Sequence, residues 1–209
     1  MIAVVDYGVG NLFSLKSSLA AIGAETVVTG DAAVLHNADR IILPGVGAFG
    51  DAADKLAATG MRDAVLAEAR AGKPLLGICL GMQLLFEKGM EYGEHAGLGL
   101  IPGTVVDLKP VLPEGLKVPH IGWNALRLSQ PDHPLMKNTR DGDCVYFVHS
   151  FYATDCADWT LATAEYGVDV TAAVARENVM GCQFHPEKSG AVGLAILKAF
   201  CEMKEDAVC

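Results

Sequence analysis

One cysteine occupies a position from which a chain can present a nucleophile. Cys79 follows the apolar run Pro74-Leu75-Leu76 and precedes the run Leu84-Leu85-Phe86, a pattern that predicts a strand, a sharp turn and a helix. Gly77 and Gly81 stand two residues to either side, where a side chain would collide with the backbone of so tight a turn. The turn also places the sulfur at a helix N-terminus, where free N–H groups and the helix dipole favour thiolate over thiol. We therefore expect Cys79 to be a nucleophile.

A base and an orienting carboxylate follow near the end of the sequence. Residues 179–184 predict a short buried strand, and Pro186 ends it, so His185 is expected at its C-terminal edge. Glu187 lies two residues further on, and alternate residues of an extended segment face the same way. The carboxylate can accept a hydrogen bond from one imidazole nitrogen and leave the other facing Cys79, as in a catalytic triad. A core cysteine and a plain His-Pro-Glu turn are the simpler interpretations, and the occurrence of both motifs in one chain argues against them.

The two motifs together resemble those of class I glutamine amidotransferases, which use a Cys-His-Glu triad. The resemblance rests on Gly77-x-Cys79-Leu80-Gly81-x-Gln83 and His185-Pro186-Glu187. Five segments narrow the resemblance to the glutaminase subunits of imidazole glycerol phosphate synthases, namely 6–12, 44–47, 119–124, 146–150 and 185–189. It extends from Met1 to about Phe200, while the tail from 202 to Cys209 matches no known pattern.

The resemblance implies both a reaction and a partner. The substrate would be L-glutamine, hydrolysed to glutamate and ammonia. The ammonia would pass to a cyclase subunit, a (βα)8 barrel in a heterodimer with this chain, which makes imidazole glycerol phosphate and aminoimidazole carboxamide ribonucleotide in histidine biosynthesis. No cofactor and no metal is implied.

Other functions remain open at this stage. The chain could be the glutaminase subunit of another ammonia-channelling synthase, such as pyridoxal phosphate synthase, although segments 6–12 and 146–150 argue against it. It could be a non-catalytic binding subunit, although its cysteine, histidine and glutamate are intact. A cysteine peptidase or a thiol redox sensor would not require Gln83 or the loop 44–47 in its present form.

Two backbone donors are expected to stabilise the oxyanion of acyl transfer. The N–H of Leu80, the residue after the nucleophile, can point at the developing charge. Residues 44–47 (Pro-Gly-Val-Gly) resemble the oxyanion loop of the family, so the second donor is expected at Val46 or Gly47. In a parallel sheet this loop lies at the same C-terminal edge as Cys79, although an ordinary turn would give the same sequence.

Five residues are expected to bind glutamine. Gln83 lies four residues after Cys79, one helical turn away on the same side. Glu91 is a candidate for the substrate ammonium, and a solvated loop carboxylate is nearly as good an interpretation. The resemblance implies that His149, Ser150 and Phe151 offer backbone groups to the glutamine main chain.

Four residues are expected to contact the partner subunit. The resemblance places the loop that contains Asn11 near the partner, although a plain turn into a helix would also explain the loop. Trp123, in a segment that starts at Pro119, is either a core side chain or an interface anchor, and the resemblance favours the interface. Lys188 resembles an interface lysine near the ammonia exit.

Composition excludes several classes of protein. The 209 residues are 51% hydrophobic with a net charge of −9, which suits one well-buried domain and makes nucleic acid an unfavourable partner. No apolar stretch reaches the ~20 residues of a membrane span, and no signal peptide is recognised. The six cysteines are scattered, which argues against zinc and disulfides and fits a cytoplasmic protein. The loop 8–12 lacks the third glycine of a dinucleotide-binding fingerprint.

The pattern of apolar runs predicts an α/β fold in one domain that spans residues 1–209. Strands are expected at 2–6, 26–28 and 40–43, with a helix from Leu12 to Ile22 and a helical region from about 51 to 71. We therefore expect a central, mostly parallel sheet flanked by helices. After Gly97, short runs broken by Pro, Gly and Asp predict an additional mixed or antiparallel region. A closing helix carries an apolar face from Val192 to Met203.

Overall fold

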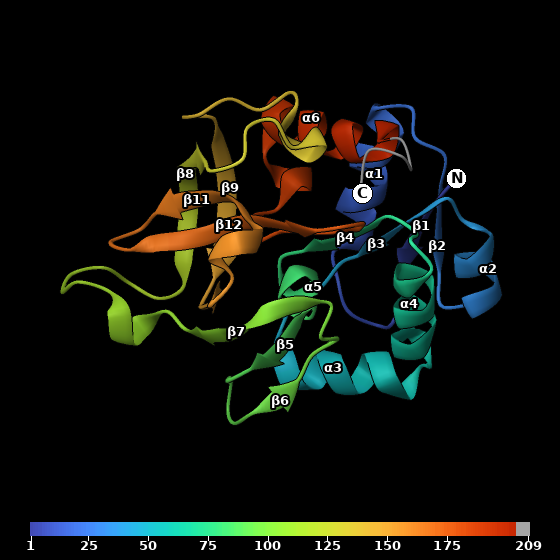
Figure 1. The fold of residues 1–209 in the computed structure, drawn as a ribbon, viewed down its shortest axis with the longest axis horizontal. Helices are drawn as coiled ribbons and strands as arrows, with labels where there is room; N and C mark the ends of the chain where they lie inside the picture. The colour runs from blue at the N-terminus through green and yellow to red at the C-terminus, as the bar shows by residue number, and fades with distance from the viewer. Residues whose placement is uncertain (204–209) are drawn as a thin grey trace.

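A nine-stranded sheet runs through the molecule in the computed structural model, which describes residues 1–203 (Figure 1). Its strand order is β2-β1-β3-β4-β13-β12-β11-β8-β9. The first five strands are parallel: β2 (Thr26–Thr29), β1 (Ile2–Val5), β3 (Arg40–Leu43), β4 (Leu75–Ile78) and β13 (Val179–Cys182). The remaining four are antiparallel: β12 (Asp169–Arg176), β11 (Thr160–Glu165), β8 (His120–Leu128) and β9 (Cys144–His149).

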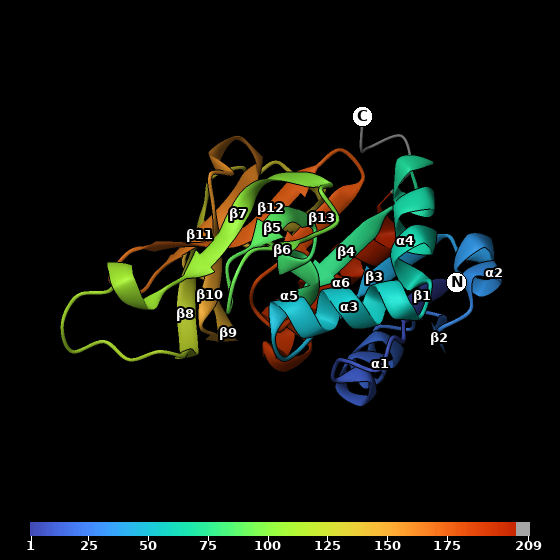
Figure 2. The same cartoon turned by 90° about the horizontal axis from the view of Figure 1, so that it is seen from below.

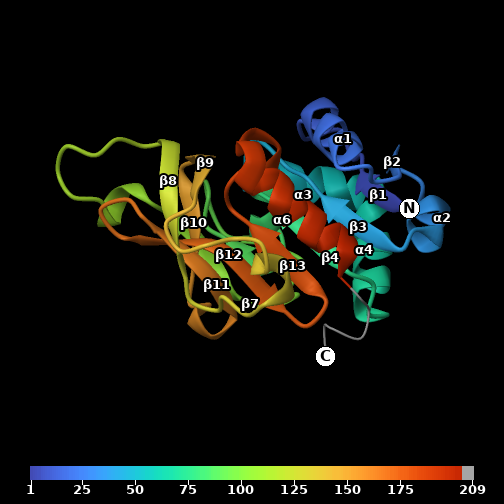
Figure 3. The ribbon, with the colours of Figure 1, turned by 90° about the horizontal axis from the view of Figure 1, so that it is seen from above.

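Helices cover both faces of the parallel half (Figures 2 and 3). On one face, α1 (Leu12–Ala21) and α6 (Gly190–Glu202) bury Leu19, Ile196 and neighbouring apolar side chains against the sheet. On the other face, α3 (Phe49–Ala58) and α4 (Met61–Arg70) bury Phe49 and Val65, and α2 (Ala32–Asn37) packs beside α4. The expected α/β fold with a mostly parallel sheet flanked by helices is confirmed.

A second sheet forms the additional mixed region. Its order is β10-β7-β5-β6, made of β10 (Phe151–Thr154), β7 (Ile101–Asp107), β5 (Phe86–Gly89) and β6 (His95–Ala96). The chain passes from the main sheet to this one at Ser150, between β9 and β10. Short 3₁₀ turns complete the fold: η1 (Lys109–Val111), η2 (Pro134–Met136), η3 (Ala157–Trp159) and η4 (Pro186–Lys188).

Two element predictions were wrong in detail, at the helix after the cysteine and at the end of the strand before His185. The helix after the cysteine, α5 (Leu80–Gln83), ends before the apolar run 84–86, and Phe86 begins strand β5. An uninterrupted apolar run does not distinguish a buried strand from a buried helix. The helical region expected over 51–71 is present as the two helices α3 and α4, separated at Gly60, whose φ is 74°. The strand expected over 179–184 ends at Cys182.

The parallel strands bring the predicted site together. β1, β3, β4 and β13 run the same way, so the loops after them meet at one edge of the sheet. These loops carry residues 6–11, the segment 44–47, Cys79 and the His-Pro-Glu motif. The last six residues, which include Cys209, lie outside the described part of the chain. Within residues 1–203 no helix has the length and apolar character needed to cross a membrane.

Candidate active site

Cys79 lies on a strained turn between β4 and α5. Its backbone has φ 54° and ψ −112°, a conformation that a non-glycine residue adopts at a cost and that recurs at nucleophile elbows. A Cβ atom at Gly77 would lie 2.6 Å from the carbonyl oxygen of Gly81, and one at Gly81 would lie 1.9 Å from that of Leu43. The expectation that both flanks require glycine is confirmed.

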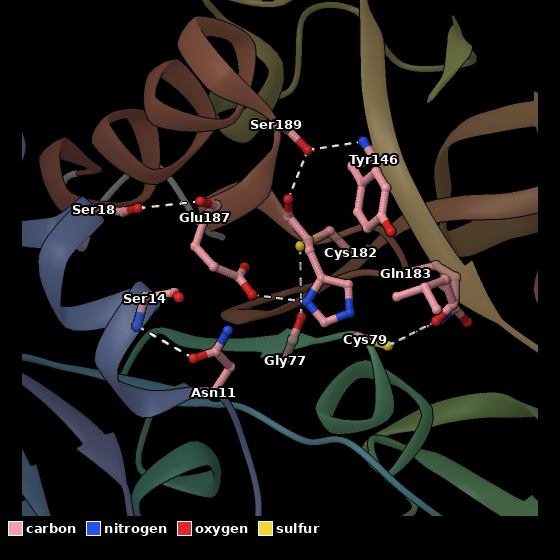
Figure 4. Close-up of polar contacts among 12 residues, drawn as sticks. Asn11, Ser14, Ser18, Gly77, Cys79, Tyr146, Cys182, Gln183, Glu187 and Ser189 are labelled. Atoms are coloured by element: carbon pink, nitrogen blue, oxygen red, sulfur yellow. Dashed lines mark hydrogen bonds and ion pairs between the residues drawn. The ribbon is translucent and has the colours of Figure 1, made fainter. Parts of the chain in front are cut away.

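His185 and Glu187 form a buried pair behind the cysteine. His185 Nδ1 and Glu187 Oε1 are 2.8 Å apart, and both side chains are 3% exposed. An extended segment was expected to bring these two side chains together. The structure does so with the 3₁₀ turn η4, which Pro186 starts. Figure 4 shows that Ser18 and Ser189 brace this turn: Ser189 Oγ donates to His185 O at 2.6 Å, and Ser18 Oγ donates to Glu187 O at 3.4 Å.

The electrostatics of this group favour a charged imidazole. Burial, the largest single effect, lowers the pKa of His185, but hydrogen bonds to Cys79 and Glu187 and the negative charges of both outweigh it. The net result raises the pKa of His185 from 6.5 to about 9. The imidazolium is therefore retained at neutral pH beside the sulfur.

A cavity of about 360 Å³ opens in front of the cysteine. Most of the predicted site residues line it, together with Val148: Val46, Gly47, Cys79, Leu80, Gln83, Glu91, Pro119, His149, Ser150, Phe151, His185 and Lys188. The structure thus brings together residues separated by more than 100 positions. Asn11, Trp123 and Glu187 are the predicted residues outside its lining.

The loop 44–47 packs against the start of α5, and both line this cavity. Leu80 is the first residue of α5, where a backbone N–H has no intrahelical partner, and Gly47 has φ 100°. Tyr7 holds the start of the loop, because its hydroxyl donates to Pro44 O at 2.9 Å. Burial first, and then the negative charge of Cys79, raise the pKa of Tyr7. The hydroxyl therefore stays protonated and can donate to Pro44 O.

Gln83 and Glu91 reach the cavity with part of their polar groups already used. Gln83 Nε2 donates to Phe151 O at 2.9 Å and to Gln183 Oε1 at 3.0 Å, which leaves Oε1 of Gln83 as its free group. Glu91 Oε2 accepts from Phe49 N at 2.7 Å and so caps the N-terminus of α3, which has no cap from its own N-cap side chain. Glu91 is therefore not a solvated loop carboxylate.

His149 takes part in a buried row of polar side chains that the sequence did not reveal. His149 Nδ1 lies 2.9 Å from Phe151 O, and His149 Nε2 lies 3.0 Å from His120 Nδ1. His120 Nε2 lies 2.7 Å from Asn124 Oδ1, and Asn124 Nδ2 donates to Glu165 O at 3.0 Å. Burial is the main effect on both rings; it lowers the pKa of His120 and lowers that of His149 to about 3.

The four residues expected at an interface occupy the same edge of the molecule. Trp123 is 55% exposed on β8, and its ring packs edge-on against Tyr146 of β9 at 6.0 Å. Lys188 Nζ lies 5.7 Å from the Tyr146 ring. Tyr146 therefore lies between Trp123 and Lys188, a residue of the cavity wall. Pro119 lines the cavity, and Asn11 caps α1 by accepting from Ser14 N at 3.4 Å (Figure 4).

Two residues at the site were missed from the sequence. Gln183 is fully buried, and its Nε2 lies 3.7 Å from Cys79 Sγ. A glutamine inside an apolar run of the sequence needs buried partners, and this was the available signal. Tyr146 carried no such signal, because its contact with Trp123 depends on the β8–β9 register.

A family model for class-I glutamine amidotransferases matches residues 3–203. The chain belongs to this family. It is 48% identical over 204 residues to the imidazole glycerol phosphate synthase subunit HisH of Caldanaerobacter subterraneus subsp. tengcongensis, covering 97% of this chain and 98% of that one. It is 52% identical over 206 residues to the protein of the same name from Lacticaseibacillus casei, covering 99% and 97%.

Solved structures agree on the fold. A crystal structure of a glutamine amidotransferase superposes with a TM-score of 0.73 at 20% identity, covering 96% of this chain and 99% of that one. PurLQS from Thermotoga maritima gives 0.72 at 22% identity, covering 95% and 96%. The resemblance inferred from the elbow and the His-Pro-Glu motif is confirmed at the level of the family.

Proposed function

We propose that this chain is the glutaminase subunit of an imidazole glycerol phosphate synthase, with Cys79, His185 and Glu187 as its catalytic triad. The observation that carries the proposal is the strained Cys79 beside the buried His185–Glu187 pair, at the wall of a cavity that can hold one amino acid. The names of the relatives support the assignment to this synthase and do not favour pyridoxal phosphate synthase.

The reaction follows from the charges of the site. The Cys79 thiolate attacks the side-chain amide carbon of glutamine, and the resulting oxyanion accepts hydrogen bonds from Leu80 N–H and from the Val46–Gly47 segment. The C–N bond then breaks, and the His185 imidazolium gives its proton to the departing ammonia. Water attacks the glutamyl thioester while His185 takes its proton, and the C–S bond breaks to release glutamate. Glu187 holds the imidazole and its charge throughout.

Substrate recognition uses groups that the fold leaves free at the cavity wall. Gln83 is restricted to accepting through Oε1, because its N–H groups are taken. The backbone of His149, Ser150 and Phe151, where the chain changes sheets, is proposed to bind the main chain of glutamine. The second carboxylate oxygen of Glu91 is proposed to face the substrate ammonium.

The partner is proposed to be the (βα)8-barrel cyclase subunit, bound over the cavity mouth in the cytoplasm. Ammonia is wasted unless a synthase receives it directly, so a docked partner suits the chemistry. Apolar side chains exposed at this edge support the docking, namely Phe13 at the start of α1, Val46 in the loop and Trp123 on β8. The whole chain, 1–209, is proposed to act as one amidotransferase domain.

Glutamate release from glutamine tests the proposal. The chain alone should be slow, and addition of the cyclase subunit with its phosphoribosyl-formimino carboxamide ribonucleotide should accelerate it strongly. The Cys79→Ala variant should lose several orders of magnitude, since triads act as a unit. A fast rate that is indifferent to the cyclase would keep the hydrolysis and reject this synthase, whereas an active Cys79→Ala protein would reject the triad.

A further inference from the structure

Gln183 is a fully buried polar residue placed directly against the nucleophile. It lies between β13 and the His-Pro-Glu motif, and both ends of its side-chain amide have partners. Its Oε1 accepts from Gln83 Nε2 at 3.0 Å, and its Nε2 lies 3.7 Å from Cys79 Sγ. Figure 4 shows the side chain directed at the sulfur. A buried amide is costly unless paired, so these contacts define the environment of the residue.

The orientation of the Gln183 side-chain amide is fixed by the carbonyl of Phe151, which acts on it through Gln83. Phe151 O can only accept, so the Gln83 group that faces it at 2.9 Å must be the NH₂. The same NH₂ faces Gln183 at 3.0 Å, so Gln183 must present its oxygen there. The NH₂ of Gln183 is then left facing the sulfur. Neither amide can rotate by 180° without placing two donors or two acceptors against each other.

We propose that Gln183 is a further catalytic residue of glutamine hydrolysis, which holds the Cys79 sulfur as a thiolate by donating an amide N–H to it. A hydrogen bond donated to an anion stabilises the anion. Gln83 acts as a positioning residue that fixes the orientation of Gln183. The inference deepens the proposed function and rests on it for the reaction, but the contact with the sulfur can be tested without glutamine.

Alkylation of Cys79 by iodoacetamide as a function of pH provides that test. Peptide mass spectrometry assigns the modified cysteine, because five others are present. Gln183→Leu should move the midpoint of the Cys79 rate to higher pH by about one unit, the tenfold effect of one hydrogen bond to a charged group. Its limiting alkaline rate should rise, because a thiolate released from a donor is more nucleophilic. Gln183→Glu keeps the shape, places an acceptor at the sulfur and should move the midpoint further.

In Gln183→Leu the other ionisable groups near the sulfur are unchanged, so the shift of its midpoint reports the lost amide donor. They come from every element packed around Cys79: Tyr7, Glu91, His149, Cys182, His185, Glu187 and Lys188. Gln130→Leu is the matched control, since Gln130 Nε2 donates to the backbone oxygen of Thr160, at 3.1 Å, away from the cavity. Its alkylation profile should equal that of the parent.

The outcomes separate this inference from the proposed function. An unchanged midpoint in folded Gln183→Leu and Gln183→Glu proteins overturns the inference, even if both lose glutaminase activity. If Gln183→Leu does not fold, Gln183→Met, which also lacks the donor and adds no charge, takes its place. A shifted midpoint in a chain that hydrolyses no glutamine with the cyclase present supports the contact and rejects the proposed function. With the function intact, Gln183→Leu should lower kcat at neutral pH about tenfold with little change in KM.

Discussion

Gly81→Ala tests whether close backbone contact positions Cys79, the proposed nucleophile. The new Cβ would lie 1.9 Å from Leu43 O, whereas real Cβ contacts are essentially never shorter than 3.0 Å. The turn that carries Cys79 must therefore move away from β3 by more than about 1 Å, and a displacement of that size can cost about 100-fold in rate. Overpacking of this kind destabilises a core by about 1–3 kcal/mol. Each kcal/mol lowers the Tm of a chain of this size by about 2–4 °C.

The assay combines glutamate release in the presence of the cyclase with thermal unfolding. Gly72→Ala is the matched control, because Gly72 precedes the other end of β4, has φ 93° and has open space around its Cβ position. It should cost about 1–2 kcal/mol of stability from backbone strain while kcat stays near that of the parent. If Gly81→Ala retained kcat within twofold and an unchanged Tm, the argument from backbone collision would be refuted.

Three further substitutions test the charge of His185, the anchoring of the loop 44–47 and the proposed interface with the cyclase. Glu187→Gln should move the alkaline limit of glutamine hydrolysis from near pH 9 to lower pH, because Glu187 helps to raise the pKa of His185 above 6.5; a pH profile of kcat/KM measures this. Tyr7→Phe should cost about 0.5–1.5 kcal/mol in urea unfolding, since the hydrogen bond to Pro44 O is lost. Trp123→Ala should weaken cyclase binding by about 2 kcal/mol, roughly 30-fold in Kd by calorimetry, as for an interface hot spot.

Each of these has an outcome that contradicts it. An alkaline limit that stays in place in Glu187→Gln would mean that the carboxylate does not act on His185. Equal urea midpoints for parent and Tyr7→Phe would remove Tyr7 as an anchor of the loop. Phe13→Ala, at another exposed aromatic residue, serves as a comparison for Trp123→Ala. If Trp123→Ala left the affinity for the cyclase unchanged, the interface would lie elsewhere.

The elements that the sequence predicts well are those with a local cause. The elbow follows from Gly77 and Gly81, and the parallel half follows from apolar runs that alternate with amphipathic ones. The end of α5 was not predictable, because residues 84–86 are apolar in either conformation. The contact of His185 with Glu187 was predicted from an extended segment, while the structure makes it with a turn that Pro186 starts.

The parts of the site that were missed depend on contacts distant in sequence. Gln183 meets Gln83 across 100 positions, and His120 meets His149 only because β8 and β9 pair in one register. A single sequence contains no register between strands separated by a long connection. It does show that Gln183 is a polar residue inside an apolar run, and that observation alone predicts a buried partner.

The row from Asn124 to Phe151 has a consequence for the number of protons that it holds. Both ends are acceptors, since Asn124 turns its oxygen inward and Phe151 offers a carbonyl, so three contacts require three hydrogens. Two neutral imidazoles carry only two, and burial keeps both rings neutral. One of the three contacts therefore always lacks a hydrogen, and a change of tautomer relocates the gap without moving a heavy atom. The tautomers of His120 and His149 therefore decide which contact goes without a hydrogen, along a row that starts at Asn124 beside Trp123 and ends at the Phe151 carbonyl that also accepts from Gln83.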